Sequence, residues 1–252
     1  MIKVSGLTYS IAGTPILHDI NATLPAGRIT ALIGPNGAGK STLLHLISQQ
    51  IPFDRGRITM GGLDLAKTTA PARALKMAVV GQQLGVASRI RIRDLVGFGR
   101  WPHNHGRPTP KDQEKISEAL SHFDLIGLQD RFLDEVSGGQ RQRAFIAMAS
   151  AQDTDWLLLD EPLNNLDLHH ARCLMTQLRE KVDREGKSVV IVLHDLNYAI
   201  SWADHVVALD KGSIAFEGPL TEVATTDSLS ALYRTPVVLS DLAGKPFVQY
   251  HR

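Results

Sequence analysis

The sequence predicts an α/β fold with a mostly parallel central sheet, and two observations lead to this prediction. Short apolar runs at residues 29–33, 77–80, 156–159 and 188–193 have the length and composition of buried strands. Helical patterns at residues 43–47 and 168–184 alternate with these runs. Such alternation is typical of a parallel sheet that is covered by helices.

The strand at 29–33 runs directly into a glycine-rich segment that matches the phosphate-binding loop pattern. Its glycines permit backbone angles that a β-carbon would forbid, so successive N–H groups can face one anion, and the following helix adds its positive end. Lys40 offers a cation for the β and γ phosphates, and the Ser41 hydroxyl can ligate Mg²⁺. The strand–loop–helix context favours a nucleoside triphosphate site over an ordinary turn. The loop comprises Gly34, Pro35, Asn36, Gly37, Ala38, Gly39, Lys40, Ser41 and Thr42.

Composition excludes several classes of protein. The 252 residues include 27 Lys and Arg against 26 Asp and Glu, and this balance argues against a strongly basic nucleic-acid binder. The single cysteine, Cys173, cannot form an internal disulfide, so we expect a reducing compartment. The first residues lack signal-peptide features, and no apolar run is long enough to span a bilayer. We therefore expect any membrane role to depend on a partner.

Residues 2–33 alternate apolar runs with turn signals, which predicts a small β-rich layer ahead of the phosphate loop. Tyr9 is the aromatic residue of this layer that precedes the loop. Its ring could stack on a nucleotide base, an interaction of roughly 1–3 kcal/mol that does not read base identity. The alternative is a half-buried strand tyrosine, and spacing alone slightly favours that alternative.

The segment at about 88–150 changes character and predicts a helical subdomain inserted into the α/β core. A helical pattern begins at Asp94 and is expected to break at Gly97, and residues 111–128 form an amphipathic pattern. His103 and His105 lie in an expected exposed loop, and no nearby Cys, Asp or Glu completes a metal site with them. The tail from residue 221 onwards carries no predicted chemistry.

Polar residues at strand and helix ends give further candidates. Asp160 and Glu161 end the strand at 156–159, where α/β folds place ligands. Asp160 suits Mg²⁺, and Glu161 can polarise an attacking water. We favour these functional roles over the alternative that both are solvated acids in a turn. Gln82 could reach a metal or a water, although a polar strand end is the commoner case. His194 is either a γ-phosphate contact or a capped strand end.

A second helix start with features of an anion site lies at residues 137–140. Ser137 is a candidate N-cap, and Gly138 and Gly139 leave the first amides of the helix open to an anion. Alone, this pattern fits any capped helix. A chain with two such helix starts is less ordinary.

Together these motifs resemble the ATP-binding subunits of ABC transporters over nearly the whole chain. Residues 34–41 resemble the Walker A motif, residues 137–140 the signature motif, and residues 157–162 Walker B with its catalytic glutamate. Gln82, residues 164–167 and His194 fall where the family has its Q-loop, D-loop and switch histidine, and Tyr9 matches its base-stacking aromatic. The departures are Val136 and Gly81, in place of the usual leucine and proline, and Asn164 and Asn165, in place of small D-loop residues.

The resemblance implies one ABC ATP-binding domain over residues 1–252, with a P-loop NTPase core, an N-terminal antiparallel β layer and the helical subdomain. It implies a head-to-tail dimer of two copies around two ATP molecules. Mg²⁺ would be held by Ser41, Gln82 and Asp160, Glu161 would act on water, and Lys40 and His194 would hold phosphates. In trans, each ATP would meet Ser137, Gly138, Gly139, Gln140 and Asp167 of the other copy.

The resemblance also implies partners and a location at the cytoplasmic face of the inner membrane. The partners would be integral membrane permease subunits, docked near Gln82 and the helical insertion, and indirectly an extracytoplasmic substrate-binding protein. Residues 95–103 resemble importers of iron-siderophore complexes, and haem and cobalamin importers share much of that pattern. The rivals are an ABC-type ATPase that acts on nucleic acid, which would typically carry large insertions or fused cassettes, and a scaffold that binds ATP without turnover. We expect no nucleic-acid partner.

Overall fold

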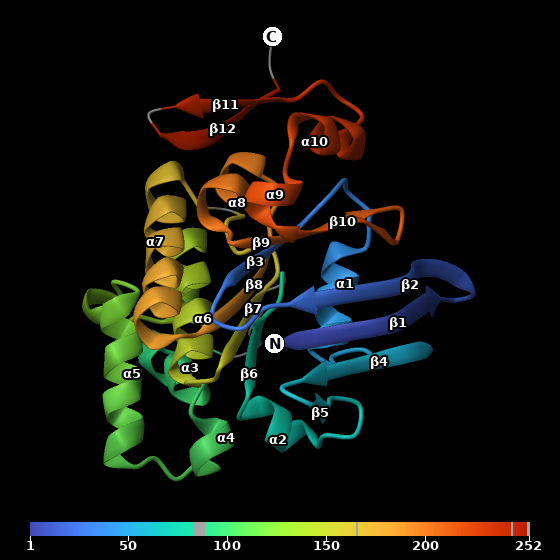
Figure 1. Cartoon of the computed structure of the whole chain (residues 1–252). Helices are drawn as coiled ribbons and strands as arrows, with labels where there is room; N and C mark the ends of the chain where they lie inside the picture. The colour runs from blue at the N-terminus through green and yellow to red at the C-terminus, as the bar shows by residue number, and fades with distance from the viewer. Residues whose placement is uncertain (83–88, 165, 243, 251–252) are drawn as a thin grey trace. The chain divides into compact units, whose positions relative to one another are not determined.

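The computed structural model describes residues 1–82, 89–164, 166–242 and 244–250. The chain divides into two compact units. The first unit comprises Met1–Thr68 and Ser188–Arg252, and the second comprises Thr69–Lys187. The path of the chain through both units is shown in Figure 1.

The N-terminal part of the first unit forms an antiparallel sheet in the strand order β2-β1-β4-β5. Residues with buried side chains, among them Ile2, Val4 and Leu7, recur along β1 and fix the face that packs inward. This sheet confirms the predicted β layer. Its strands are β1 (Ile2–Ile11), β2 (Thr14–Leu24), β4 (Arg55–Met60) and β5 (Leu63–Asp64).

Four further strands of the first unit form a mostly parallel arrangement in the order β10-β9-β3-β8. β3 (Ile29–Ile33) pairs in parallel with β8 (Ser188–Val192) and β9 (His205–Asp210), and β10 (Ser213–Pro219) returns antiparallel to β9. Every residue of β3 and β8 is buried, as expected for strands that helices cover on both faces. The strands predicted at 29–33 and 188–193 are confirmed.

Helices and a C-terminal hairpin complete the first unit. Helix α1 carries four buried apolar residues on its inner side, as its sequence pattern predicts. The tail forms a helix and then a two-stranded antiparallel hairpin. These elements are α1 (Lys40–Ile47), α8 (Leu196–Trp202), α9 (Leu220–Val223), α10 (Thr226–Tyr233), β11 (Val238–Leu242) and β12 (Lys245–Gln249).

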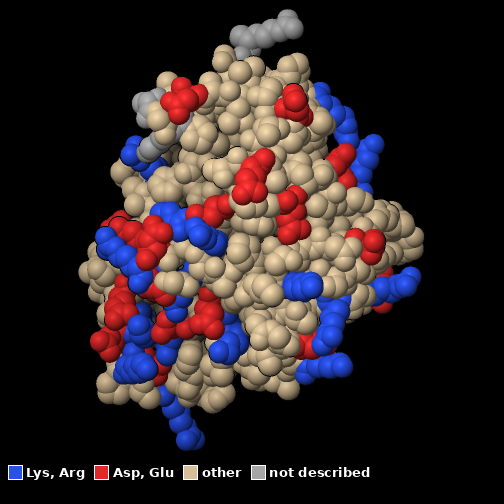
Figure 2. Space-filling model, in the orientation of Figure 1, with Lys and Arg blue, Asp and Glu red and all other residues tan. Residues whose placement is uncertain are grey.

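The second unit combines two parallel strands with most of the helices that the structure describes. On α7, oppositely charged side chains pair at a spacing of four residues, for example Arg179 with Asp183 at 2.8 Å. Basic and acidic side chains are intermixed over the face that includes α5 and α7 (Figure 2). The elements are α2 (Ala70–Ala74), β6 (Met77–Val80), α3 (Ile92–Phe98), α4 (Trp101–Asn104), α5 (Pro110–His122), α6 (Gly138–Ala151), β7 (Trp156–Leu159), α7 (Leu168–Glu185) and two short 3-10 turns, Ile126–Leu128 and Leu133–Glu135.

Helix boundaries in this unit differ from the sequence prediction at three places. Helix α3 continues through Gly97, because Ile92, Leu95 and Val96 are buried and tertiary packing outweighs the weak helix propensity of glycine. The stretch with His103, expected to be a loop, forms α4. Helix α5 ends at His122, before Asp124 adopts a left-handed φ of 54°. The inserted subdomain at 88–150 stays a prediction, and Ser88 lies outside the described residues.

A buried ion pair joins the helices of this unit. Arg100 Nε lies 2.9 Å from Asp112 Oδ1, and both residues are about 97% buried. Asp112 also accepts the Thr109 N–H in the capping box that begins α5. The Thr109 N–H and then the Arg100 guanidinium hold the pKa of Asp112 well below its ordinary value. Within the described part of the chain, no helix is both long enough and apolar enough to cross a bilayer.

Candidate nucleotide-binding and hydrolysis site

The glycines of the phosphate loop occupy backbone conformations that other residues rarely adopt. Gly34, Gly37 and Gly39 have φ values of 139°, 77° and 99°. A β-carbon on Gly34 would lie 2.1 Å from the carbonyl oxygen of Leu209, so neighbouring backbone also excludes any side chain there. The predicted need for glycine at these positions is confirmed.

Lys40 is held against this loop. Its Nζ donates to the carbonyl oxygens of Gly34 at 2.9 Å and Pro35 at 3.0 Å, and only 5% of the residue is exposed. Lys40 is also the first residue of α1, so the ammonium group and the positive end of the helix lie together. Of the other loop residues, Asn36 and Gly37 are exposed, Ala38 is buried, and Pro35, Ser41 and Thr42 are half-buried.

Two other candidates of the first unit lie on or beside its sheets. Tyr9 is half-buried on β1, opposite Leu17 of β2, so both the stacking role and the structural role remain compatible with its position. His194 is exposed and follows β8 by two residues. Between them, Leu193 donates its N–H to Leu32 of β3 at 3.2 Å, which ties the chain to the sheet just before His194.

The two acids of the second unit differ in environment. Asp160 is 1% exposed, and its N–H donates to the Val80 carbonyl at 2.9 Å at the end of β6. Glu161 has a left-handed φ of 51°, which is uncommon for a residue with a side chain. Such strained positions gather at functional sites.

Two amides bind one carboxylate oxygen of Glu161. Gln82 Nε2 lies 2.8 Å and Asn164 Nδ2 lies 2.6 Å from Glu161 Oε2. The structure therefore brings the predicted residues Gln82 and Glu161 together and adds Asn164, which sequence reasoning did not assign to the site. The sequence did carry one sign of this contact, because position 164 holds an asparagine where the D-loop usually has a small residue. Asn165 lies outside the described residues.

The signature segment forms a capped helix start. The Ser137 side chain accepts the N–H of Gln140 at 3.2 Å, and the Gln140 side chain accepts the N–H of Ser137 at 3.0 Å. This reciprocal capping box confirms Ser137 as the N-cap of α6. Ser137 and Gly138 are exposed, and Gly139 and Gln140 are half-exposed.

Asp167 has a local structural role. It is the N-cap of α7, and its Oδ1 accepts the backbone N–H of His170 at 2.8 Å and contacts Nδ1 of the same residue at 2.7 Å. The His170 N–H and then its imidazole lower the pKa of Asp167. A contact of Asp167 with ATP in trans stays a prediction, as does the joining of the phosphate loop, Asp160 and Glu161 in one site.

The buried strand, glycine loop and helix of the first unit define a nucleotide-binding protein of the P-loop class. The chain belongs to the ABC transporter family, because the sequence pattern of that family matches residues 17–164.

Relatives and solved structures agree with this assignment. The chain is 44% identical over 233 residues to the petrobactin import ATP-binding protein YclP of Bacillus subtilis, and the match covers 92% of each chain. It is 37% identical to the hemin import ATP-binding protein HmuV of Streptomyces coelicolor, covering 94% of this chain and 84% of that one. Its fold matches the dimeric post-hydrolysis structure of the ATP-binding cassette MJ0796 with ADP and Pi at a TM-score of 0.79 and 25% identity, covering 87% of this chain and 99% of that one.

Proposed function

We propose that this chain is the ATP-hydrolysing subunit of a membrane importer for ferric siderophore complexes. The observation that carries the proposal is the 44% identity, over nearly the full length of both chains, to a protein named for petrobactin import. A haem importer is the second candidate, favoured by the 37% identity to a protein named for hemin import. A cobalamin importer rests on the sequence pattern at 95–103 alone.

ATP would be gripped by the phosphate loop. The backbone N–H groups around Gly37 and Gly39, the start of α1 and the Lys40 ammonium would bind its phosphates, and Tyr9 would stack on the base. Oxygen donors are the ligands that Mg²⁺ prefers, and Ser41, Gln82 and Asp160 offer a hydroxyl, an amide and a carboxylate. Mg²⁺, when bound, would neutralise charge on the β and γ phosphates.

Hydrolysis would depend on Glu161 and His194. The Glu161 carboxylate, oriented by two amides, would polarise the attacking water, and His194 would hold the γ-phosphate. Glu161→Gln should lower turnover by about 10²–10⁴, because a positioned base contributes about that much, and should leave ATP binding intact. Near-normal hydrolysis by Glu161→Gln would remove Glu161 from this role.

ATP would close a head-to-tail dimer of two copies. The exposed start of α6, with Ser137 and Gly138, would offer backbone donors to a γ-phosphate that the phosphate loop of the partner already holds. Loss of the γ-phosphate would remove the contacts that favour the closed state. The dimeric MJ0796 cassette supports this assembly.

The permease would dock on an exposed apolar surface of the helical segment. Phe98 is 55% exposed and Trp101 is 56% exposed, although large apolar side chains are usually buried. Their neighbours Leu95 and Val96 are 3% and 0% exposed, so they belong to the core. The proposed docking surface therefore consists of Phe98 and Trp101. The subunit would lie peripherally at the cytoplasmic face of the inner membrane.

This docking surface can be tested with a matched control. Phe98→Ala combined with Trp101→Ala should abolish import in cells and spare the basal ATPase rate of the isolated subunit. Ile126→Ala removes another exposed apolar side chain of the same unit and should affect neither activity. Equal loss of import and basal ATPase in the double variant would contradict docking at Phe98 and Trp101.

The cargo can be tested in a deletion strain under iron limitation. We expect growth to fail when a ferric siderophore is the sole iron source and to proceed with haem. Restoration by the wild-type gene, and not by the Glu161→Gln gene, would link the phenotype to hydrolysis. Growth that fails with haem and proceeds with each siderophore would favour the haem importer instead.

A further inference from the structure

The C-terminal segment at residues 226–250, comprising α10 and the β11–β12 hairpin, lies against the turn that carries His194. That turn joins β8 to α8, and His194 precedes the first residue of α8 by two positions. One end of the turn is fixed by the sheet, because every residue of β8 is buried and Leu193 bonds to β3. The other end continues into α8, so the contacts that hold α8 also bear on the position of His194.

Asn197 in the first turn of α8 binds the hairpin through both atoms of its amide group. Its Oδ1 accepts the Val248 N–H at 2.8 Å, and its Nδ2 donates to the Val248 carbonyl at 3.2 Å. The side chain thus pairs with β12 as a neighbouring strand would. Val248 itself is 1% exposed, so these bonds lie in a packed contact where an unpaired amide is costly.

The same turn is fixed locally at its start. Asp195 is the N-cap of α8, and its Oδ1 accepts the N–H of Asn197 at 2.8 Å. Asn197 therefore links two structures, since its backbone closes the turn after His194 and its side chain joins that turn to β12.

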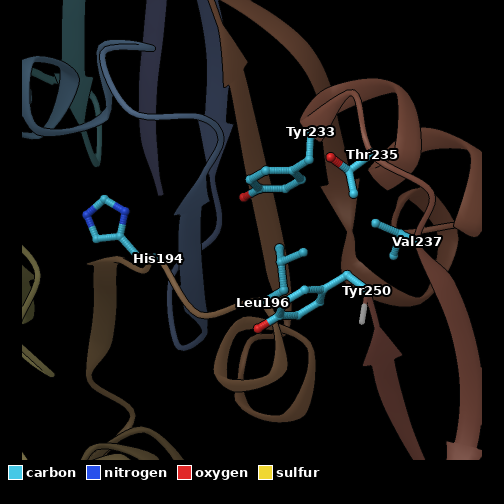
Figure 3. A pocket seen from close by; sticks show the side chains of 6 residues that line it. All are labelled: His194, Leu196, Tyr233, Thr235, Val237 and Tyr250. Atoms are coloured by element: carbon cyan, nitrogen blue, oxygen red, sulfur yellow. The ribbon is translucent and has the colours of Figure 1, made fainter. Parts of the chain in front are cut away.

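A pocket of about 260 Å³ lies beside this contact. His194 and Leu196 line it from the α8 side, and Tyr233, Thr235, Val237 and Tyr250 line it from the C-terminal segment. Figure 3 shows His194 on one side of the pocket and the two tyrosine rings on the other. The C-terminal segment thus forms part of the surroundings of His194.

Tyr233 connects the C-terminal segment to the phosphate loop as well. Its hydroxyl oxygen accepts the N–H of Gly34 at 3.1 Å. Burial raises the pKa of Tyr233 to about 12, so the hydroxyl stays neutral at physiological pH. The segment therefore contacts both loops of the first unit that are proposed to handle the γ-phosphate.

We propose that Asn197 is a positioning residue for His194, and that it acts by anchoring α8 to the C-terminal hairpin. The inference rests on the proposed role of His194 at the γ-phosphate. Displacement of a catalytic group by about 1 Å can lower a rate by about 10²-fold, whereas binding of the whole nucleotide depends mainly on the phosphate loop. Removal of the Asn197 amide should therefore lower kcat about 5–50-fold and change ATP affinity less than 3-fold.

Asn21 provides a matched control in the same unit. Its side chain also makes two amide bonds to backbone, accepting the Gly6 N–H at 2.9 Å and donating to the Asp19 carbonyl at 2.9 Å, but it lies in the β1–β2 layer. Asn197→Ala and Asn21→Ala each remove two hydrogen bonds from a side-chain amide to the backbone, part-buried at Asn197 and exposed at Asn21. Only Asn197→Ala should lower kcat while leaving ATP affinity nearly unchanged.

The test compares the full-length wild type with Asn197→Ala, Asn197→Asp, Asn21→Ala and His194→Ala. The measurements are single-turnover ATP hydrolysis, equilibrium binding of a fluorescent ATP analogue, the Tm, and hydrogen exchange of residues 193–200 and 246–249. We expect Asn197→Ala to lower the hydrolysis rate and to speed exchange in both segments. Asn197→Asp keeps the acceptor for the Val248 N–H and should fall between wild type and Asn197→Ala.

Each outcome decides the question. If His194→Ala loses turnover and Asn197→Ala hydrolyses ATP as Asn21→Ala does, the inference is wrong while the proposed role of His194 stands. If His194→Ala hydrolyses ATP normally, the role of His194 is wrong and the inference falls with it. If Asn197→Ala loses turnover and ATP affinity together, and to an extent that matches its loss of Tm relative to wild type, Asn197 has only a structural role. Should Asn197→Ala not fold, the same criteria apply to Asn197→Asp.

Discussion

Asn164→Ala tests the proposal that two amides orient the catalytic carboxylate. In the wild type, Gln82 and Asn164 donate to the same oxygen of Glu161, at 2.8 and 2.6 Å. Removal of the Asn164 amide takes away one of these two donors, and the Glu161 side chain gains freedom to leave the geometry that is proposed to polarise water. We therefore expect a lower kcat with little change in ATP affinity, because the Asn164 amide acts on the carboxylate that is proposed to polarise water.

The size of the effect follows from the strength of one such bond. A hydrogen bond to a charged group contributes about 1.5–3 kcal/mol when buried, and the exposure of Asn164 beside the half-buried Glu161 reduces this to about 1–2 kcal/mol. Since about 1.4 kcal/mol corresponds to a tenfold change in rate, kcat should fall about 5–30-fold. Asn164→Ser, which restores a small residue with one donor, should recover part of the loss.

A double-mutant cycle with Glu161→Gln is the sharpest assay. If Asn164 acts through Glu161, adding Asn164→Ala to Glu161→Gln should cost little further activity, because the group that it orients has already lost its charge. Steady-state and single-turnover rates should be measured for all four proteins. If the fold losses in kcat of the two single variants multiply fully in the double variant, Asn164 does not act through Glu161. The same conclusion would follow if Asn164→Ala mainly weakened ATP binding.

The remaining predictions concern the folding of the second unit. Asp112→Asn breaks the buried pair with Arg100 and should cost about 3–5 kcal/mol of unfolding free energy, whereas Asp183→Ala on the surface of α7 should cost less than about 1 kcal/mol. Because folding lowers the pKa of Asp112, the ionised carboxylate contributes fully to the free energy of unfolding above about pH 5, and this contribution is lost as the pH falls below about 4. In urea titrations, the difference in unfolding free energy between wild type and Asp112→Asn should therefore shrink below about pH 4. Gly97→Ala should be neutral or stabilising by up to about 1 kcal/mol, because its β-carbon would meet only the Ile116 side chain at 3.6 Å. Gly99→Ala should lower the Tm markedly, because its β-carbon would lie 2.1 Å from the Met148 carbonyl oxygen, and an unchanged Tm for Gly99→Ala would contradict that packing.

Much of the fold and of the site was predictable because it depends on local pattern. The buried strand at 29–33, the glycines after it and the apolar face of α1 are each readable within a few residues. The cap at Ser137 is likewise local, since its partner Gln140 is three residues away. The prediction at Gly97 was wrong because buried neighbours on α3 outweigh glycine's intrinsic preference.

The unpredicted contacts join residues that are distant in sequence or depend on side-chain geometry. Tyr233 binds Gly34 across 199 positions, and Asn197 binds Val248 across 51. No periodicity or motif pairs such residues, because the contact exists only once the chain has folded. Asn164 is close to Glu161 in sequence, but its role depends on the left-handed backbone at Glu161, which no local pattern indicates.

The central claim is that ATP joins two copies of this chain and that hydrolysis releases them. The most direct measurement is the molar mass of the Glu161→Gln variant in solution, by light scattering or small-angle X-ray scattering, with and without ATP and Mg²⁺. We expect a monomer without nucleotide, a dimer with ATP, and a monomer again when ADP replaces ATP. A monomer with ATP, even in the presence of the permease, would contradict the central claim.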